Sequence, residues 1–148
     1  MVKLNLPEYD FRITKSGGKL FIFDPLRKKN IVLTPEEWVR QHFIQYLIND
    51  LHYAKPLIKI ESGLRYNNLP RRSDILVYDR KGQPFLIVEC KSFEFKIDQK
   101  AFDQISRYNQ TLKAPYIVVT NGMQHFCCQI SHKDQSFEFL DNIPIAGQ

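Results

Sequence analysis

The sequence predicts an α/β fold in which a mixed β-sheet is flanked by α-helices. Residues 72–78 and 84–91 are rich in aliphatic and β-branched side chains and enclose a turn-forming stretch, which predicts a β-hairpin. Residues 35 to about 50 and 98–112 repeat apolar side chains at helical spacing. The apolar residues 116–120 follow the second helix, and a strand that returns through a helix pairs in parallel. A hairpin with a parallel neighbour makes the sheet mixed.

Length and composition fit one compact domain over residues 1–148. The chain is 43% hydrophobic, with residues 1–19 as a lead-in and residues 142–148 as a tail that we expect to be flexible. Its net charge of +5 is compatible with a polyanionic partner. Three cysteines without CxxC spacing indicate neither a zinc ribbon nor a disulfide framework. Without a leader or an apolar run near 18 residues, we expect a cytoplasmic protein with no membrane partner.

The N-terminal third predicts two short strands and a helix. Residues 20–23 and 31–33 flank a basic loop whose Arg27, Lys28 and Lys29 either face solvent or contact phosphate. Thr34 then caps a helix with proline at its first position, and Glu37 stands at the third position of a capping box. Residues 57–61 predict a further strand before an irregular connection.

The register of the central hairpin decides which side chains meet. A turn centred between Lys81 and Gly82 places Asp74 opposite Glu89, and the alternation of a strand puts Lys91 on the same face as Glu89. The alternative is a turn that ends with Gly82 in a left-handed bulge. That turn shifts the pairing by one residue and sends Asp74 to the opposite face.

Two opposed carboxylates at the end of an apolar strand indicate that a cation lies between them or that one of them is protonated, because like charges at that distance repel. Asp74, Glu89 and the backbone carbonyl of Cys90 suit Mg²⁺, for which Mn²⁺ can substitute. Lys91 could then orient or deprotonate a water, or neutralise a phosphate. The alternative is a cross-strand salt bridge on a solvated face.

Arginines immediately precede this carboxylate pair in the sequence. Arg71 and Arg72 stand just before Asp74, where guanidinium groups could bind a phosphate backbone. The alternative is that they neutralise Asp74 or face water.

The C-terminal part predicts a helix, a strand and a hairpin. Asp98 caps the helix, and Gln104 and Tyr108 lie one turn apart on one of its faces. Residues 116–120 form the buried strand, and residues 124–130 and 136–140 pair as a final hairpin.

These motifs, in this order, resemble the PD-(D/E)xK nuclease superfamily. The spacing of Asp74 and Glu89-Cys90-Lys91 carries the resemblance, together with Thr34-Pro35-Glu36-Glu37, residues 103–109 and Thr120-Asn121-Gly122. More narrowly, residues 30–130 look like the N-terminal nuclease domain of type I restriction enzyme R subunits. Ser73 stands where the superfamily pattern has proline, and the sequence has no helicase motor after the domain.

The resemblance implies a restriction-endonuclease-like fold and a metal-dependent endonuclease that hydrolyses DNA phosphodiester bonds. It implies catalytic roles for Asp74, Glu89 and Lys91, Glu37 as a further candidate metal ligand, and Gln104 and Tyr108 as supporting QxxxY residues. Expected partners are DNA, separately supplied restriction-modification subunits and a second copy of the chain. The alternatives are a catalytically inactive nucleic-acid-binding or assembly module, an RNA or branched-DNA substrate, and a purely structural site.

Overall fold

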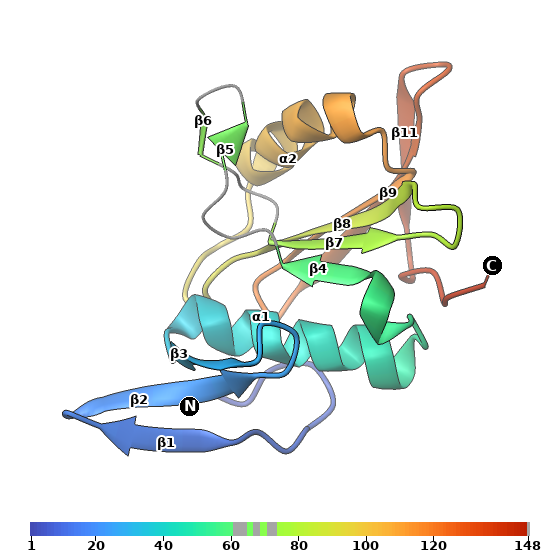
Figure 1. Cartoon of the computed structure of the whole chain (residues 1–148). Coiled ribbons are helices and arrows are strands. Elements are labelled where there is room, and N and C mark those ends of the chain that lie inside the picture. Colours follow the sequence, from blue (N-terminus) through green and yellow to red (C-terminus); the bar gives the residue numbers. More distant parts are fainter. Residues whose placement is uncertain (61–64, 67–68, 71–73, 148) are drawn as a thin grey trace.

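The computed structural model describes residues 1–60, 65–66, 69–70 and 74–147, and Figure 1 shows their arrangement. A six-stranded sheet forms the centre of the molecule, in the order β11-β10-β9-β8-β7-β4. Its strands are β4 (Ile58–Ile60), β7 (Ile75–Tyr78), β8 (Pro84–Cys90), β9 (Tyr116–Thr120), β10 (His125–Ser131) and β11 (Ser136–Leu140). Strands β8 and β9 are parallel and the other neighbours antiparallel, so the predicted mixed sheet is confirmed.

Two helices cover the two faces of this sheet (Figure 1). α1 (Pro35–Gln45) begins after Thr34, whose hydroxyl accepts a hydrogen bond from the Glu37 N–H at 3.1 Å. The helix continues into a π-helical turn (Tyr46–Asp50). α2 (Gln99–Leu112) begins after Asp98, whose carboxylate accepts a hydrogen bond from the Ala101 N–H at 3.2 Å. Both predicted helix starts are confirmed.

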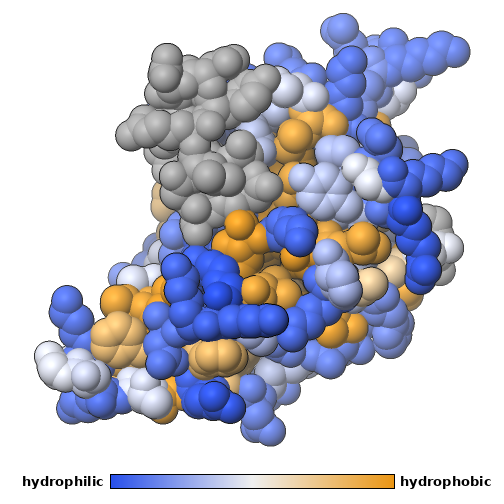
Figure 2. Space-filling view, viewed as in Figure 1, coloured by the Kyte–Doolittle hydropathy of each residue, from blue (hydrophilic) through white to orange (hydrophobic). Residues whose placement is uncertain are grey.

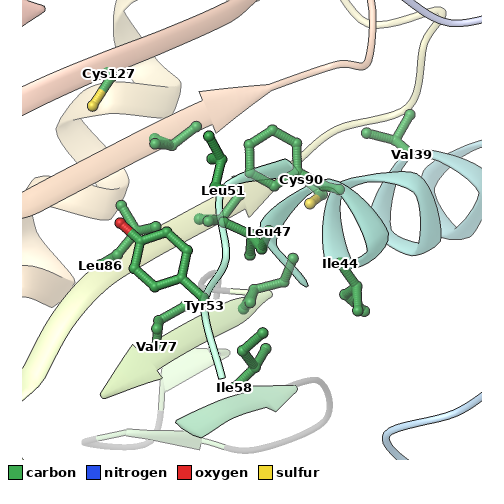
Figure 3. Close-up of a cluster of buried hydrophobic side chains, with 14 of the residues drawn as sticks. Val39, Ile44, Leu47, Leu51, Tyr53, Ile58, Val77, Leu86, Cys90 and Cys127 are labelled. Carbon is green, nitrogen blue, oxygen red and sulfur yellow. The ribbon is translucent and has the colours of Figure 1, made fainter. Parts of the chain in front are cut away.

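The alternation of the strands divides the core into two layers. One layer packs between α1 and the sheet and includes Val39, Ile44, Leu47, Val77 and Leu86, which are among the side chains drawn in Figure 3. The other layer packs beneath α2 and contains Leu76, Ile87, Ala101, Ile105, Ile117 and Val119. Because successive residues of β7 and β8 point to opposite helices, both strands are buried on both faces, as their apolar sequences predicted.

A smaller antiparallel sheet precedes α1. It contains β1 (Ile13–Ser16), β2 (Lys19–Asp24) and β3 (Lys29–Val32) in that order. The sequence predicted strands near β2 and β3 but only a lead-in and loop over residues 1–19, so β1 was missed. All four side chains of β1 are exposed, which leaves no apolar alternation to reveal the strand.

The segments at the two ends also contact the fold. The Asn5 N–H donates to the carbonyl of Gly122 at 2.8 Å, and the Ala146 N–H donates to the carbonyl of Leu51 at 2.9 Å. A short strand pair, β5 (Arg65–Tyr66) and β6 (Leu69–Pro70), interrupts the predicted connection before β7. None of the helices in the described ranges has the length and apolar character needed to cross a membrane.

Candidate active site

The register of β7 and β8 brings the predicted carboxylates to one end of the sheet. Ile75 pairs with Val88, and the Asp74 N–H donates to the Val88 carbonyl at 3.0 Å, so Asp74 lies beside Glu89. Near the turn, however, the hairpin has the alternative geometry, in which the turn ends with a left-handed glycine and the pairing is shifted by one residue. Gly82 has a φ of +80°, and Tyr78 pairs with Pro84. An irregularity at Phe85 then adds one residue to β8 and restores the predicted pairing.

Both oxygens of Asp74 have protein partners. Its Oδ2 accepts a hydrogen bond from the Cys90 N–H at 2.7 Å, and its Oδ1 accepts one from Nη2 of Arg40 at 2.6 Å. The first bond crosses the hairpin and the second comes from α1. Asp74 is therefore oriented by two different elements.

Glu89 is the more deeply buried carboxylate, with 2% of its surface exposed. Its Oε2 has no hydrogen-bond partner among the described residues. Burial raises the pKa of Glu89 to about 10, and the charge of Asp74 and a side-chain hydrogen bond with it act in the same direction. The positive charge of Lys91 opposes this shift of the Glu89 pKa. A buried carboxylate with an unpartnered oxygen suits a cation ligand.

Lys91 lies at the end of the same strand. Its N–H donates to the Thr120 carbonyl at 2.8 Å, and its Nζ lies 5.2 Å from the centre of the Phe95 ring. The backbone bond joins Lys91 to the end of β9, and the ring holds the ammonium group by a cation–π contact. Lys91 is half-buried, so its charge remains accessible beside Glu89.

Arg40 is a residue of this site that sequence reasoning missed. It is 5% exposed, and its guanidinium bonds Glu37 and Asp74, with Glu36 at 3.4 Å. Burial, the largest single influence, disfavours its charge, but the charges of Asp74 and Glu37, the interaction with Cys90 and the hydrogen bond to Asp74 together outweigh burial and raise the pKa of Arg40. The spacing of Glu36 and Glu37 from Arg40, four and three residues along a helix, was a signal for these pairs.

Glu37, predicted as a further candidate metal ligand, has other partners. One carboxylate oxygen bonds Arg40, and the other accepts hydrogen bonds from Arg27 at 3.0 Å and Gln41 at 2.8 Å. Glu37 therefore holds Arg40 in place. In the predicted capping box, the backbone N–H of Glu37 donates to the hydroxyl of Thr34. The carboxylate of Glu37 makes the ion pairs described above.

Glu36 is the carboxylate of α1 that is electrostatically coupled to the site. Its pKa is raised, first by burial and then by the charge of Asp74, whereas Arg40 and Lys91 act in the opposite direction. Sequence reasoning missed Glu36 because Glu37 occupied the capping position. The charges of Glu36, Asp74 and Lys91 all act on the pKa of Glu89, so these four residues are electrostatically coupled.

The supporting residues predicted from the sequence are Gln104 and Tyr108 of α2 and the arginines Arg71 and Arg72. Tyr108 of α2 packs against the core layer beneath that helix, and Gln104 lies half-buried one turn before it. Arg71 and Arg72 lie outside the described residues. The described residues contain no group of three or more His, Cys, Asp and Glu side chains arranged to hold a metal. The candidate donor set is therefore two carboxylates, Asp74 and Glu89, with the Cys90 carbonyl, which suits an ion such as Mg²⁺ that retains several waters.

Comparisons with known proteins identify the family of this chain. Residues 35–144 match the family model described as type I restriction enzyme R protein N terminus (HSDR_N). A search of curated proteins gives no match. Among solved structures, a fragment described as an HsdR subunit of a type I restriction enzyme from Vibrio vulnificus YJ016 is 20% identical, with a TM-score of 0.38. That match covers 59% of this chain and 16% of the other. Because the family model spans well over half of the sequence, the chain belongs to the family of type I restriction enzyme R protein N-terminal domains.

Proposed function

We propose that this domain is a metal-dependent endonuclease of the PD-(D/E)xK type that hydrolyses DNA phosphodiester bonds. The observation that carries the proposal is the unpartnered oxygen of Glu89, which is buried beside a second carboxylate. A charge in this place is unfavourable unless a cation neutralises it. The family of the chain, which is that of restriction enzyme R proteins, supports the choice of DNA as substrate.

Asp74, Glu89 and the Cys90 carbonyl would hold the metal, with Mg²⁺ as the expected ion and Mn²⁺ as a substitute. When bound, such an ion polarises the phosphate and lowers the pKa of a coordinated water. Lys91 would orient the attacking water or neutralise charge on the phosphate, since the charge of its ammonium group acts on Glu89 and lowers the pKa of that carboxyl. The Phe95 ring, 5.2 Å from Nζ of Lys91, supports this placement of the charge.

Glu36 is a candidate for a third carboxylate at this site. Its side chain is 48% exposed and coupled to Asp74, so it can rotate toward a bound ion without leaving a buried gap. Glu37 is a less suitable ligand than Asp74, because two arginines, Arg27 and Arg40, neutralise Glu37, whereas Asp74 is bonded by Arg40 alone among these arginines. Arg71, Arg72, Gln104 and Tyr108 remain proposed contacts to the DNA strand or to Lys91.

Other restriction-modification subunits and a second copy of the chain are proposed partners. The solved structure compared above is much longer than this chain, since the match covers 16% of it. Sequence recognition and DNA translocation would then be supplied outside this domain.

A second candidate function is a catalytically inactive nucleic-acid-binding or assembly module. The observation that favours it is the ion pair between Arg40 and Asp74, which already gives one of the two carboxylates a positive partner. In such a module the guanidinium of Arg40 would replace a metal as the counter-charge.

Cleavage of supercoiled plasmid with Mg²⁺ or Mn²⁺ tests the proposal. Glu89→Gln and Lys91→Ala should each lower the nicking rate by about 10²–10⁴, because each removes a group that acts on the reacting atoms. Glu94→Gln and Lys96→Ala are matched controls at exposed positions nearby and should cut normally.

Mg²⁺ titration by calorimetry separates the nuclease from the inactive binding module. An inactive wild-type protein that binds DNA but no metal would support the binding module and contradict the nuclease.

A further inference from the structure

A groove of about 500 Å³ opens between the β2–β3 turn and β4. β4 is an edge strand of the large sheet, and the turn comes from the small N-terminal sheet. Pro25, Leu26, Arg27 and Lys28 line the groove on the side of the turn, and residues 55–56 and 58–60 line it on the side of β4. Figure 2 shows hydrophilic side chains over the region of this turn, below β4 in the same view as Figure 1.

The groove is positively charged. Lys28, Lys55 and Lys59 line it and are exposed, and no described acidic side chain lines it. Within the described residues these three lysines form no ion pair. Arg27 also lines the groove but is paired with Asp24 at 2.5 Å and with Glu37 at 3.0 Å. Three lysine charges are therefore available to an anionic partner.

The groove adjoins the candidate active site through two connections. Ile60, at one end of the groove, pairs with Ile75, the residue that follows Asp74. Along the other side, Arg27 bonds Glu37, Glu37 bonds Arg40, and Arg40 bonds Asp74. An extended anionic polymer that passes the candidate active site can thus continue along the β4 edge.

We propose that this groove binds the sugar-phosphate backbone of the nucleic acid whose scissile phosphate lies at Asp74 and Glu89. The inference rests on the proposed nuclease function for its alignment with the site. Lysine ammonium groups act as point charges toward phosphates and read no base sequence. The groove therefore contributes affinity and direction, and it supplies no sequence specificity.

The test is DNA binding without metal, measured by fluorescence anisotropy of a labelled 20-base-pair duplex in EDTA over a series of salt concentrations. The groove variant combines Lys28→Gln, Lys55→Gln and Lys59→Gln. The matched control combines Lys15→Gln, Lys19→Gln and Lys133→Gln, which remove the same charge from exposed positions outside the groove. Thermal melting of all three proteins checks that they are folded.

The groove variant should bind at least about tenfold more weakly than wild type, and the slope of log K against log salt should flatten by about 0.9 for each phosphate that the protein no longer neutralises. The control should keep both the slope and most of the affinity. Equal losses in the two variants, or wild-type binding to a polyglutamate probe as tight as to DNA, would overturn the proposal. The binding assay requires no cleavage, so groove-dependent binding by a protein that does not cut DNA would support the groove proposal and contradict the nuclease proposal. Cleavage with an unchanged KM in the groove variant would contradict the groove proposal alone.

Discussion

At the scale of single residues, the candidate site depends on how buried charges are balanced. Glu89 is buried with an unpartnered oxygen, whereas Asp74 has both the Cys90 N–H and Arg40. The two carboxylates are neighbours, yet the positive partner belongs to Asp74. The metal-free protein therefore favours the proton on Glu89, whose pKa is raised mainly by burial.

The raised pKa of Glu89 predicts a pH-dependent stability. Because the folded-state pKa of this carboxyl lies above its unfolded value of 4.5, its contribution is complete below that value and is lost as pH rises toward about 10. The metal-free wild type should lose about 1.4 kcal/mol of unfolding free energy per pH unit relative to Glu89→Gln, on the order of 5 kcal/mol between pH 5 and pH 9. Urea denaturation in EDTA at pH 5, 7 and 9 measures this difference. Parallel pH profiles for the two proteins would show that Glu89 ionises normally.

The ion pairs of Arg40 predict a large effect of its removal. Arg40→Met leaves Glu37 and Asp74 buried without this partner, which should destabilise the fold by about 3–5 kcal/mol, and Arg40→Lys should cost less. Arg107→Met, at an exposed position of α2, is the control and should change stability by under about 0.5 kcal/mol. Guanidinium chloride denaturation gives all three values. A cost for Arg40→Met no larger than the control would mean that the buried pairs contribute little net stability.

At the scale of elements, turns and bulges decide which side chains meet. The β7–β8 turn has the left-handed glycine Gly82, which by itself would separate Asp74 from Glu89. The irregularity at Phe85 compensates for it within the same hairpin. Two local deviations therefore cancel, and the carboxylates lie together.

Two glycines with similar backbone geometry provide a comparison at this scale. Gly122 (φ +84°), after β9, would place an added Cβ 2.9 Å from a methyl of Leu4 and 3.1 Å from one of Val39, whereas Gly82 (φ +80°) has open space. Gly82→Ala should cost about 1 kcal/mol from backbone strain alone, and Gly122→Ala about 2–4 kcal/mol because packing adds to it. Thermal unfolding of both variants measures the difference. Equal costs would show that Leu4 moves aside without penalty.

At the scale of the whole molecule, one sheet between two helices presents one candidate site. Asp74, Glu89 and Lys91 all come from the β7–β8 hairpin and its end, and Arg40 and Glu36 come from α1. The small N-terminal sheet reaches this assembly through Arg27, which bonds Asp24 and Glu37. Residues from both sheets and a helix therefore combine at one position.

One site in each chain predicts the order of products if the domain cuts DNA. A single set of Asp74, Glu89 and Lys91 cuts one strand at a time, so supercoiled plasmid should become open circular before it becomes linear. Agarose gels over time at several protein concentrations measure this order. Direct appearance of linear DNA, with a rate that rises as the square of protein concentration, would instead indicate that a homodimer cuts both strands.

Local sequence signals determined most of the fold. Apolar runs located the strands of the large sheet, and Thr34 and Asp98 located the helix starts, because caps and periodicity depend on neighbouring residues. The Asp74 and Glu89 pair was predicted as one of two registers, but through a turn that does not occur, because the bulge at Phe85 restores the pairing. β1 was not predicted, because its exposed side chains carry no pattern.

The tertiary structure alone decided how the charges of the site are paired. The family resemblance offered Glu37 as a further candidate metal ligand, and in the fold Glu37 bonds Arg27, Arg40 and Gln41, while Arg40 bonds Asp74 across 34 positions of the chain. The spacing of Glu36, Glu37 and Arg40 on one helix did not specify which element would face them. The sequence by itself therefore determined the elements, which follow from local periodicity, and it offered the carboxylate pair as one of two registers, between which the bulge at Phe85 decided. The balance of buried charge depended on the packing of α1 against the sheet, because Coulomb interactions act through space and not along the chain.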